Sequence, residues 1–323
     1  MRRLVVAAVA IAALGATLPA WANHRAGHME PAGPAPARFP KTFGVIKDSE
    51  WGFRIGGFGG KLSDDAEWSV KHPKTPEKHL PVIFVHGNTV DAADWYPVRD
   101  AFIAAGWNAD DLWAISYNGL GGQSGTDGTT NPRRDDEHTN NPDTDYVARI
   151  TANDVNVSDL YRFVLSVRTF RKQPRFAIVA HSLGVTVARR MLKVHPGLRK
   201  HVESFVGIAG GNHGTSLCPE GSQGHLHSCD EIAKGTRWLA QLNGYRGWDE
   251  TWRGTRFLTV YDGTGTMDAA YVGPDYASSP VLRGALNCQL ADQHNDLRIA
   301  PASIAFYRSF IEGAERGRVV ACP

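Results

Sequence analysis

The sequence predicts an α/β fold with a mostly parallel central sheet and helices on both of its faces. From Leu80 onward, short apolar runs alternate with segments in which apolar residues recur at helical spacing. This alternation is typical of parallel sheets, because parallel strands are joined by helical crossovers. The motifs that carry chemistry follow the predicted strands, and such sheets bind ligands at the carboxyl ends of their strands.

The predicted strands are short and rich in branched apolar residues, and they are read from six runs. These runs are LPVIFVHG (80–87), DLWAISYNG (111–119), RFAIVAHS (175–182), HVESFVGIAGG (201–211), RFLTVYDG (256–263) and GALNCQL (284–290). Helical spacing of apolar residues predicts four main helices, at 91–106, 150–167, 185–194 and 301–312. In the first of these, Trp95, Val98 and Phe102 share one face, and Gly106 ends the helix.

The N-terminus reads as a targeting segment followed by one large domain. Residues 1–22 contain two arginines, an apolar run and a small-x-small tripeptide, which predicts a signal peptide cleaved before Asn23. A membrane anchor is the alternative, but Gly and Pro interrupt the run. Residues 23–40 are rich in Pro, Ala and Gly and predict a flexible lead-in. Residues 41–323 then form a single domain with an insertion at about 212–255.

The composition indicates a globular protein without a nucleic-acid partner. Hydrophobic residues make up 42% of the chain, enough for a sizeable core. The chain has 35 Lys+Arg and 33 Asp+Glu, and removal of Arg2 and Arg3 with the signal peptide leaves 33 against 33. After residue 22 no segment is apolar for long enough to span a bilayer, so we expect a soluble protein in the periplasm or outside the cell.

Four cysteines fit two disulfides in an oxidising compartment, with three possible pairings. We favour Cys218 with Cys229, and Cys288 with Cys322. The first pair would close a loop rich in Gly, Ser and His, and the second would tie the C-terminal tail to the core. We do not expect these cysteines to bind zinc, because no two are spaced as CxxC, and we expect no bound metal elsewhere.

The pentapeptide from Ala180 to Gly184 carries the clearest chemical signal. It joins a predicted strand to a predicted helix and matches the nucleophile elbow G-x-S-x-G, with Ala180 in place of the first glycine. A tight turn there would strain Ser182 and leave no space for larger flanking side chains. Ser182 is therefore the expected nucleophile, and the alternative is a serine that merely caps the helix.

A nucleophilic serine needs donors for the oxyanion that forms on its substrate. One expected donor is the backbone N–H of Leu183, which follows the serine, and the other is that of Asn88 in the loop after the first predicted strand. Gly87 would allow the close approach of the backbone there. We expect His86 and His181 to be structural and not to transfer protons.

The predicted base is His294, because nucleophile, acid and base follow one another in this order in such folds, and no other histidine follows the strand at 256–263. The acid must orient the imidazole and stabilise its charged form. Asp268 is our first choice, since Asp262 follows the strand so closely that it could cap the turn instead. Asp292 is third, because it lies too near His294 in sequence.

Several stretches resemble secreted bacterial lipases and esterases of the α/β-hydrolase superfamily. The resemblance covers most of the chain from about Leu80 to Ile311. It rests on PVIFVHGN, IVAHSLGVTVA, GIAGGNHG, YDGTGTMD and SSPVLRGALNCQLADQHNDL. Within that group, the Ala-His-Ser-x-Gly box is similar to that of extracellular polyhydroxyalkanoate depolymerases.

The resemblance implies an α/β-hydrolase fold and serine-dependent hydrolysis of carboxylic esters without a cofactor. Its triad corresponds to Ser182, Asp268 and His294, and its oxyanion hole to Asn88 and Leu183. The expected substrate is an ester or lipid, with a polyester as the alternative. An amidase or acyltransferase uses the same triad, and a non-catalytic binding domain on this fold is a more distant alternative.

The insertion carries apolar and aromatic residues that could contact such a substrate. They are Trp238, Leu239, Leu242, Tyr245, Trp248 and Trp252. Alternatively they form a small core of the insertion itself, which we favour for Trp238 and Leu242 because they lie at helical spacing.

Overall fold

The computed structural model describes residues 57–59, 79–87, 92–115, 153–215, 231–262 and 279–323. The predicted signal peptide and lead-in lie outside these residues. The described strands form one sheet in the order β1-β3-β2-β4-β5-β6-β7, with β1 antiparallel to β3 and all other neighbours parallel. They are β1 (Gly57–Gly59), β2 (Val82–Val85), β3 (Leu112–Ile115), β4 (Phe176–His181), β5 (Val202–Ile208), β6 (Arg256–Asp262) and β7 (Leu286–Leu290).

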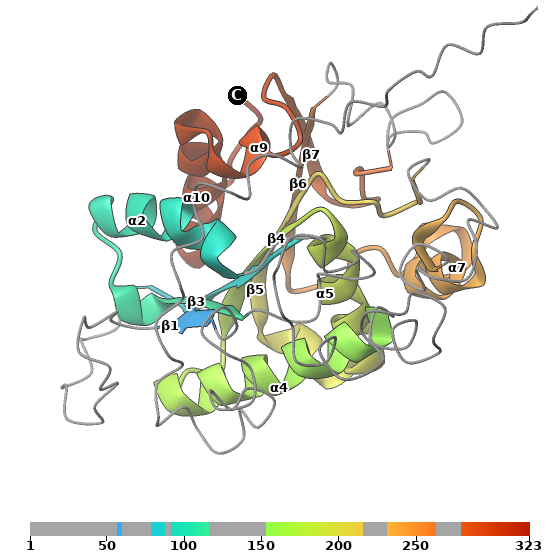
Figure 1. Ribbon diagram of the computed structural model, residues 1–323, viewed down its shortest axis with the longest axis horizontal. Coiled ribbons are helices and arrows are strands. Elements are labelled where there is room, and N and C mark those ends of the chain that lie inside the picture. Colours follow the sequence, from blue (N-terminus) through green and yellow to red (C-terminus); the bar gives the residue numbers. More distant parts are fainter. Residues whose placement is uncertain (1–56, 60–78, 88–91, 116–152, 216–230, 263–278) are drawn as a thin grey trace, which may run out of the picture.

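Helices cover both faces of the sheet, which confirms the predicted fold class. The α-helices are α2 (Tyr96–Ala104), α4 (Asn153–Arg171), α5 (Leu183–Val194), α7 (Arg237–Asn243), α9 (Asp296–Ile299) and α10 (Pro301–Glu315). Short 3-10 turns lie at Ala92–Trp95, Ala109–Asp111, Pro196–His201 and Tyr245–Gly247. Figure 1 shows α2 and α10 on one side of the sheet and α4 and α5 on the other.

The core consists of two apolar layers, one on each face, and successive strand residues alternate between them. In β2, Ile83 and Val85 pack with the layer under α4 and α5, whereas Val82 and Phe84 pack with the layer under α2 and α10. All six residues of β4 are buried, so this strand reads as a continuous apolar run. The central strand is therefore held from both sides.

Strand β1 was not predicted, because Gly-Phe-Gly is too short and too rich in glycine to read as a strand. It forms through a tertiary contact with β3. A Cβ on Gly59 would lie 1.9 Å from the ring of Trp113, so only glycine lets this edge strand lie against that tryptophan. Our expectation of a separate core in the insertion was wrong, since Trp238 and Leu242 belong to the layer under α4 and α5. A helix as short as α7 cannot enclose a core of its own.

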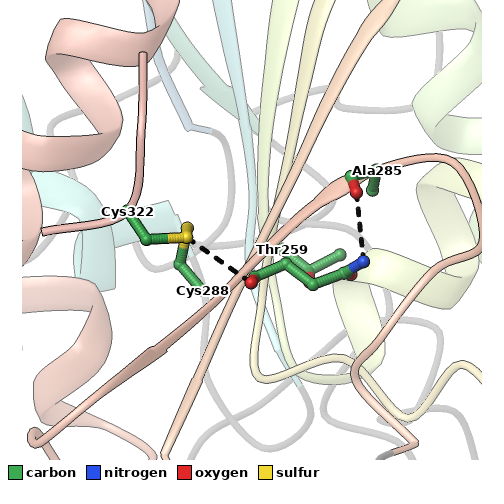
Figure 2. Close-up of a disulfide and its surroundings, with 5 residues drawn as sticks. Thr259, Ala285, Cys288 and Cys322 are labelled. Carbon is green, nitrogen blue, oxygen red and sulfur yellow. Dashed lines mark hydrogen bonds between the residues drawn. A yellow bond between two sulfur atoms is a disulfide. The ribbon is translucent and has the colours of Figure 1, made fainter.

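The predicted disulfide between Cys288 and Cys322 is confirmed. Their Cα atoms are 5.4 Å apart, and the bond joins the C-terminal tail to the buried middle of β7 (Figure 2). The disulfide therefore holds the last residues of the chain against β7. Cys218 and Cys229 lie outside the described residues, so their pairing stays a prediction.

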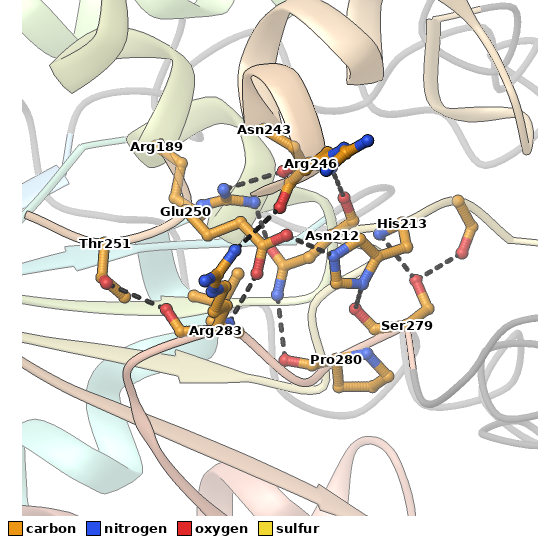
Figure 3. Close-up of polar contacts among 12 residues, drawn as sticks. Arg189, Asn212, His213, Asn243, Arg246, Glu250, Thr251, Ser279, Pro280 and Arg283 are labelled. Atoms are coloured by element: carbon orange, nitrogen blue, oxygen red, sulfur yellow. Dashed lines mark hydrogen bonds and ion pairs between the residues drawn. The ribbon is translucent and has the colours of Figure 1, made fainter. Parts of the chain in front are cut away.

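A buried guanidinium joins α5 to the segments that follow β5 and precede β7 (Figure 3). Arg189 donates to the side-chain oxygens of Asn212, at 2.9 Å, and Asn243, at 2.8 Å. The amide of Asn212 donates to the carbonyl of Pro280 at 3.0 Å, and that of Asn243 donates to the carbonyl of Asn212 at 2.9 Å. These bonds fix α7 and two loops at the carboxyl end of the sheet to one helix.

Glu250 extends this network. Its carboxylate accepts from Nε2 of His213 at 3.0 Å and from the backbone N–H of Arg283, and His213 is held in turn by the side chain and carbonyl of Ser279. Burial alone would raise the pKa of the Glu250 carboxyl. The two hydrogen bonds and the nearby charge of Arg189 outweigh burial and lower this pKa below its ordinary value. The ionised form is thus the one that the fold stabilises.

We predict that Glu250→Gln destabilises the protein in a pH-dependent way. Because the folded-state pKa is depressed, the stabilisation is present above the ordinary value of 4.5 and is lost as the pH falls through the lowered pKa. Near neutral pH, urea unfolding should show a loss of about 1.5–3 kcal/mol, the contribution of hydrogen bonds to a charged group. The gap from the parent should narrow below pH 4.5.

Asp100→Asn is the matched control, because the Asp100 side chain is exposed on α2. It should leave the unfolding free energy near that of the parent at every pH. A gap for Glu250→Gln that stays constant with pH would contradict the assigned role of the carboxylate.

Candidate active site

The site lies where the order of the strands reverses. From β2 the chain goes outward to β3 and then returns to β4 on the other side of β2. Doubly wound sheets bind ligands at such a switch point, outside the carboxyl ends of the strands. His86 and Gly87 follow β2 there, and Ser182 follows β4.

Ser182 has a strained backbone. Its φ is 53° and its ψ is −125°, outside the regions that ordinary residues prefer, and it occupies the N-cap position of α5. A capping serine is normally extended and its hydroxyl accepts from the first turn, but Ser182 makes no side-chain cap hydrogen bond. Such strain costs of the order of 1–3 kcal/mol and clusters at functional sites. The described geometry therefore differs from that of a simple helix cap.

Two glycines let the backbone approach this turn closely. A Cβ on Gly184 would lie 2.3 Å from the carbonyl oxygen of His86 and 2.6 Å from that of Val85, so a larger residue would force α5 away from β2. A Cβ on Gly87 would lie 3.1 Å from Cβ of Ser182. The loop after β2 thus begins in contact with the serine.

The structure describes one of the two predicted oxyanion donors, Leu183, but not the other, Asn88. Leu183 is the first residue of α5, so its N–H belongs to the positive end of a twelve-residue helix. Asn88 lies outside the described residues, and its role stays a prediction. Gly87, the last described residue of that loop, is placed so that a Cβ on it would meet Ser182.

His294 lies between β7 and α9, and its side chain and backbone are largely buried at 5% exposure. The imidazole rings of His294 and His181 have centroids 4.9 Å apart. Nε2 of His181 lies 3.0 Å from the backbone oxygen of His294. The fold therefore brings the predicted base next to the strand end that carries Ser182.

The three candidate acids fall in different places. Asp268 lies outside the described residues. Asp262 is the last residue of β6, is fully buried and pairs in register with Leu290 of β7. The carboxylate of Asp292 accepts from the hydroxyl of Ser303 at 2.6 Å, which engages it with α10. Asp262 thus lies at the same edge of the sheet as the serine and histidine, more deeply buried than a turn cap requires.

The two histidines expected to be structural are both buried and hydrogen-bonded. Nδ1 of His86 donates to the carbonyl of Gly87 at 2.8 Å. Burial, followed by the positive charge of Arg298, holds the pKa of His181 well below its ordinary value, so His181 is neutral. Sequence reasoning missed Arg298, whose guanidinium lies 3.4 Å from Nδ1 of His181. No motif marks this arginine, because the two residues are far apart in the chain.

Within the described ranges, no three His, Cys, Asp or Glu side chains gather as a metal centre would require. The helices of those same ranges include none that is long and apolar enough to cross a bilayer.

The chain is similar to known lipases. A family model described as Lipase (class 2) matches residues 137–245, which include Ser182. The structure superposes on Aspergillus fumigatus lipase B with a TM-score of 0.55 and 16% identity, over 88% of this chain and 62% of that one. It superposes on the propeptide form of Bacillus licheniformis lipase BlEst2 with a TM-score of 0.54 and 12% identity, over 74% and 51%.

The chain spans less than two thirds of the length of either solved structure. A search of curated protein sequences found no match. Structural similarity at these identities shows the fold and not the reaction. The chain thus has the α/β-hydrolase fold, and its stretch around Ser182 matches the class 2 lipases.

Proposed function

We propose that this protein is a serine hydrolase that cleaves carboxylic esters, of the lipase or esterase type. The observation that carries this proposal is the strained turn at Ser182, whose hydroxyl does not cap the helix that it begins. The fold and the match to class 2 lipases around this serine support it. A nucleophile raised on a strained turn at the end of a central strand is how this fold attacks carbonyl carbons.

In the proposed reaction, His294 takes the proton of Ser182 while Oγ attacks the ester carbonyl. The oxyanion then accepts hydrogen bonds from the N–H groups of Leu183 and Asn88, near the positive end of α5. His294 passes the proton to the leaving alcohol, and water releases the acid from the acyl-enzyme. Asp268 holds the imidazole in the required tautomer. No cofactor takes part.

The proposed location is the periplasm or the medium, reached through the signal peptide at residues 1–22. The disulfide between Cys288 and Cys322 supports an oxidising compartment. The same triad would serve an amidase or an acyltransferase, so the leaving group and acceptor need a direct test.

We predict that Ser182→Ala lowers kcat/KM for p-nitrophenyl butyrate by about 10³-fold or more, because the acyl-enzyme cannot form. His294→Ala should have a similar effect, since both residues act in one step. Ser309→Ala, exposed on α10, is the matched control and should hydrolyse the ester like the parent. The ratio of kcat/KM for p-nitrophenyl butyrate to that for p-nitrophenyl palmitate distinguishes a short-chain esterase from a lipase. A Ser182→Ala variant as active as the parent would overturn the proposal.

The choice of acid is tested by two asparagine variants. We predict that Asp268→Asn lowers kcat by about 10³–10⁴-fold, because an amide leaves the imidazole in the wrong tautomer. Asp262→Asn should keep most of its turnover, and circular dichroism should confirm that it is folded, because Asp262 is fully buried. An inactive, folded Asp262→Asn beside an active Asp268→Asn would move the acid to Asp262. Asp292→Asn tests the third candidate and should keep most of its turnover, and Asp100→Asn, exposed on α2, serves as the control.

A second candidate, a polyester depolymerase, is favoured by one surface feature. Tyr245 and Trp248 in the insertion are 71% and 69% exposed, and their rings pack edge to face with centroids 6.4 Å apart. Exposed aromatic residues in adjacent positions often mark contact surfaces, and a solid polyester must be bound by such a surface. This candidate keeps the same catalytic residues and changes only the substrate.

If the second candidate is right, replacing Tyr245 and Trp248 together by serine should slow the clearing of a polyhydroxybutyrate suspension. Hydrolysis of p-nitrophenyl butyrate should stay near the parent level, because a small soluble ester needs no adsorption. Val319→Ser is the control, since Val319 is exposed elsewhere on the chain. A parent that never clears the suspension would exclude this candidate.

A further inference from the structure

We propose that His181 is a positioning residue, which holds the main chain of His294 beside Ser182 through a hydrogen bond from its Nε2–H. The inference rests on the proposed function, in which His294 is the base. It assigns a role to the residue that immediately precedes the nucleophile and that takes no part in the proton transfers described above.

The contacts of His181 select one form of its ring. Nε2 lies 3.0 Å from the carbonyl oxygen of His294, and a carbonyl can only accept, so Nε2 carries a hydrogen. Nδ1 lies 3.4 Å from Nη1 of Arg298, and a guanidinium can only donate, so Nδ1 accepts. Both partners therefore favour the neutral Nε2–H tautomer. The cationic ring would bring a second positive charge next to Arg298.

Arg298 is itself held in place by three residues from two elements. Its Nη1 pairs with the carboxylate of Asp94 in the turn before α2, and its guanidinium lies over the ring of Trp95, 5.8 Å from the centroid. The hydroxyl of Tyr307, buried on α10, donates to the backbone carbonyl of Arg298 at 2.9 Å. A chain of contacts thus runs from Asp94 through Arg298 and His181 to the backbone of His294.

This chain of contacts joins a loop to the central strand of the sheet. His294 belongs to the short segment 291–295, outside any strand or helix, whereas His181 ends β4 and pairs in register with Ile208 of β5. This hydrogen bond therefore ties the backbone of the proposed base directly to the strand that ends beside Ser182. A displacement of about 1 Å between reacting groups can cost about 10² in rate, so this restraint matters for turnover.

Two amide variants separate the two ends of the His181 ring. In His181→Gln the amide nitrogen lies near the place of Nε2 and can still donate to the carbonyl of His294. In His181→Asn the amide lies near the place of Nδ1, which keeps the contact with Arg298 but removes the donor toward His294. The pair is matched in chemistry and differs in which bond it retains.

We expect His181→Asn to lower kcat for p-nitrophenyl butyrate by about 10–100-fold with little change in KM, because misplacement of the base affects the reaction more than binding. His181→Gln should recover most of this loss. Equal losses in the two variants, or full turnover in His181→Asn, would overturn the inference. Thermal unfolding of both variants, followed alongside, shows that the comparison is made between folded proteins.

The tautomer is measured without substrate, on full-length protein labelled with ¹⁵N-histidine. The His181 resonances, identified by their loss in His181→Gln, should report a hydrogen on Nε2 and none on Nδ1 at pH 7. A hydrogen on Nδ1, or a charged ring, would overturn the inference whatever the activity of the two variants. A parent that cleaves no ester would instead overturn the proposed function, while this measurement still decides whether His181 donates to His294.

Discussion

The close approach of α5 to the end of β2 is the constraint on which the rest of the site depends. Gly184 lies directly against the last carbonyls of that strand, where no Cβ would fit. The first turn of α5 therefore lies close to the sheet, and the chain must turn from β4 into α5 at the single residue between them. Ser182 absorbs this reversal with its positive φ. Its N–H still bonds the carbonyl of Ile208, at 2.8 Å, which extends the register of β4 with β5 up to the turn.

The strain at Ser182 persists because the elements on either side are firmly packed. The strand before it is buried along its whole length, and the helix after it is buried over most of its length, with its apolar residues in the layer under α4 and α5. Full burial of one large aliphatic side chain contributes about 1.5–3 kcal/mol, which is as much as the strain at a single residue costs. A few core residues are thus enough to offset the unfavourable turn and to keep the serine presented at the sheet edge.

Around the site, hydrogen bonds of buried charged side chains hold the neighbouring segments in place. Arg189 and Glu250 place buried charges where α7 and the loops next to β5 and β7 meet, and each charge has hydrogen-bonding partners. Burial lowers the pKa of Arg189 to about 10. The hydrogen-bond donors around Glu250 lower the pKa of its carboxyl, so the carboxyl stays ionised. The same insertion that packs Trp238 inside leaves Trp248 on the surface, so it both joins the core and exposes an aromatic side chain.

The sequence by itself determined the six parallel strands, the strained turn, the order of serine and histidine, and one disulfide. These features are local or follow chain order: branched apolar runs make strands, small residues permit a tight turn, and parallel strands end at one edge. Asp262 ends β6 and Asp268 comes six residues later, and both precede His294, so chain order does not distinguish them. Only the tertiary structure decided that β1 pairs with β3, with Gly59 against Trp113, and that Trp238 joins the main core. It also decided that Arg298 meets His181 across 117 residues of chain. Such contacts depend on which side chains the packing of distant elements brings together, and no periodicity or motif in the chain encodes that.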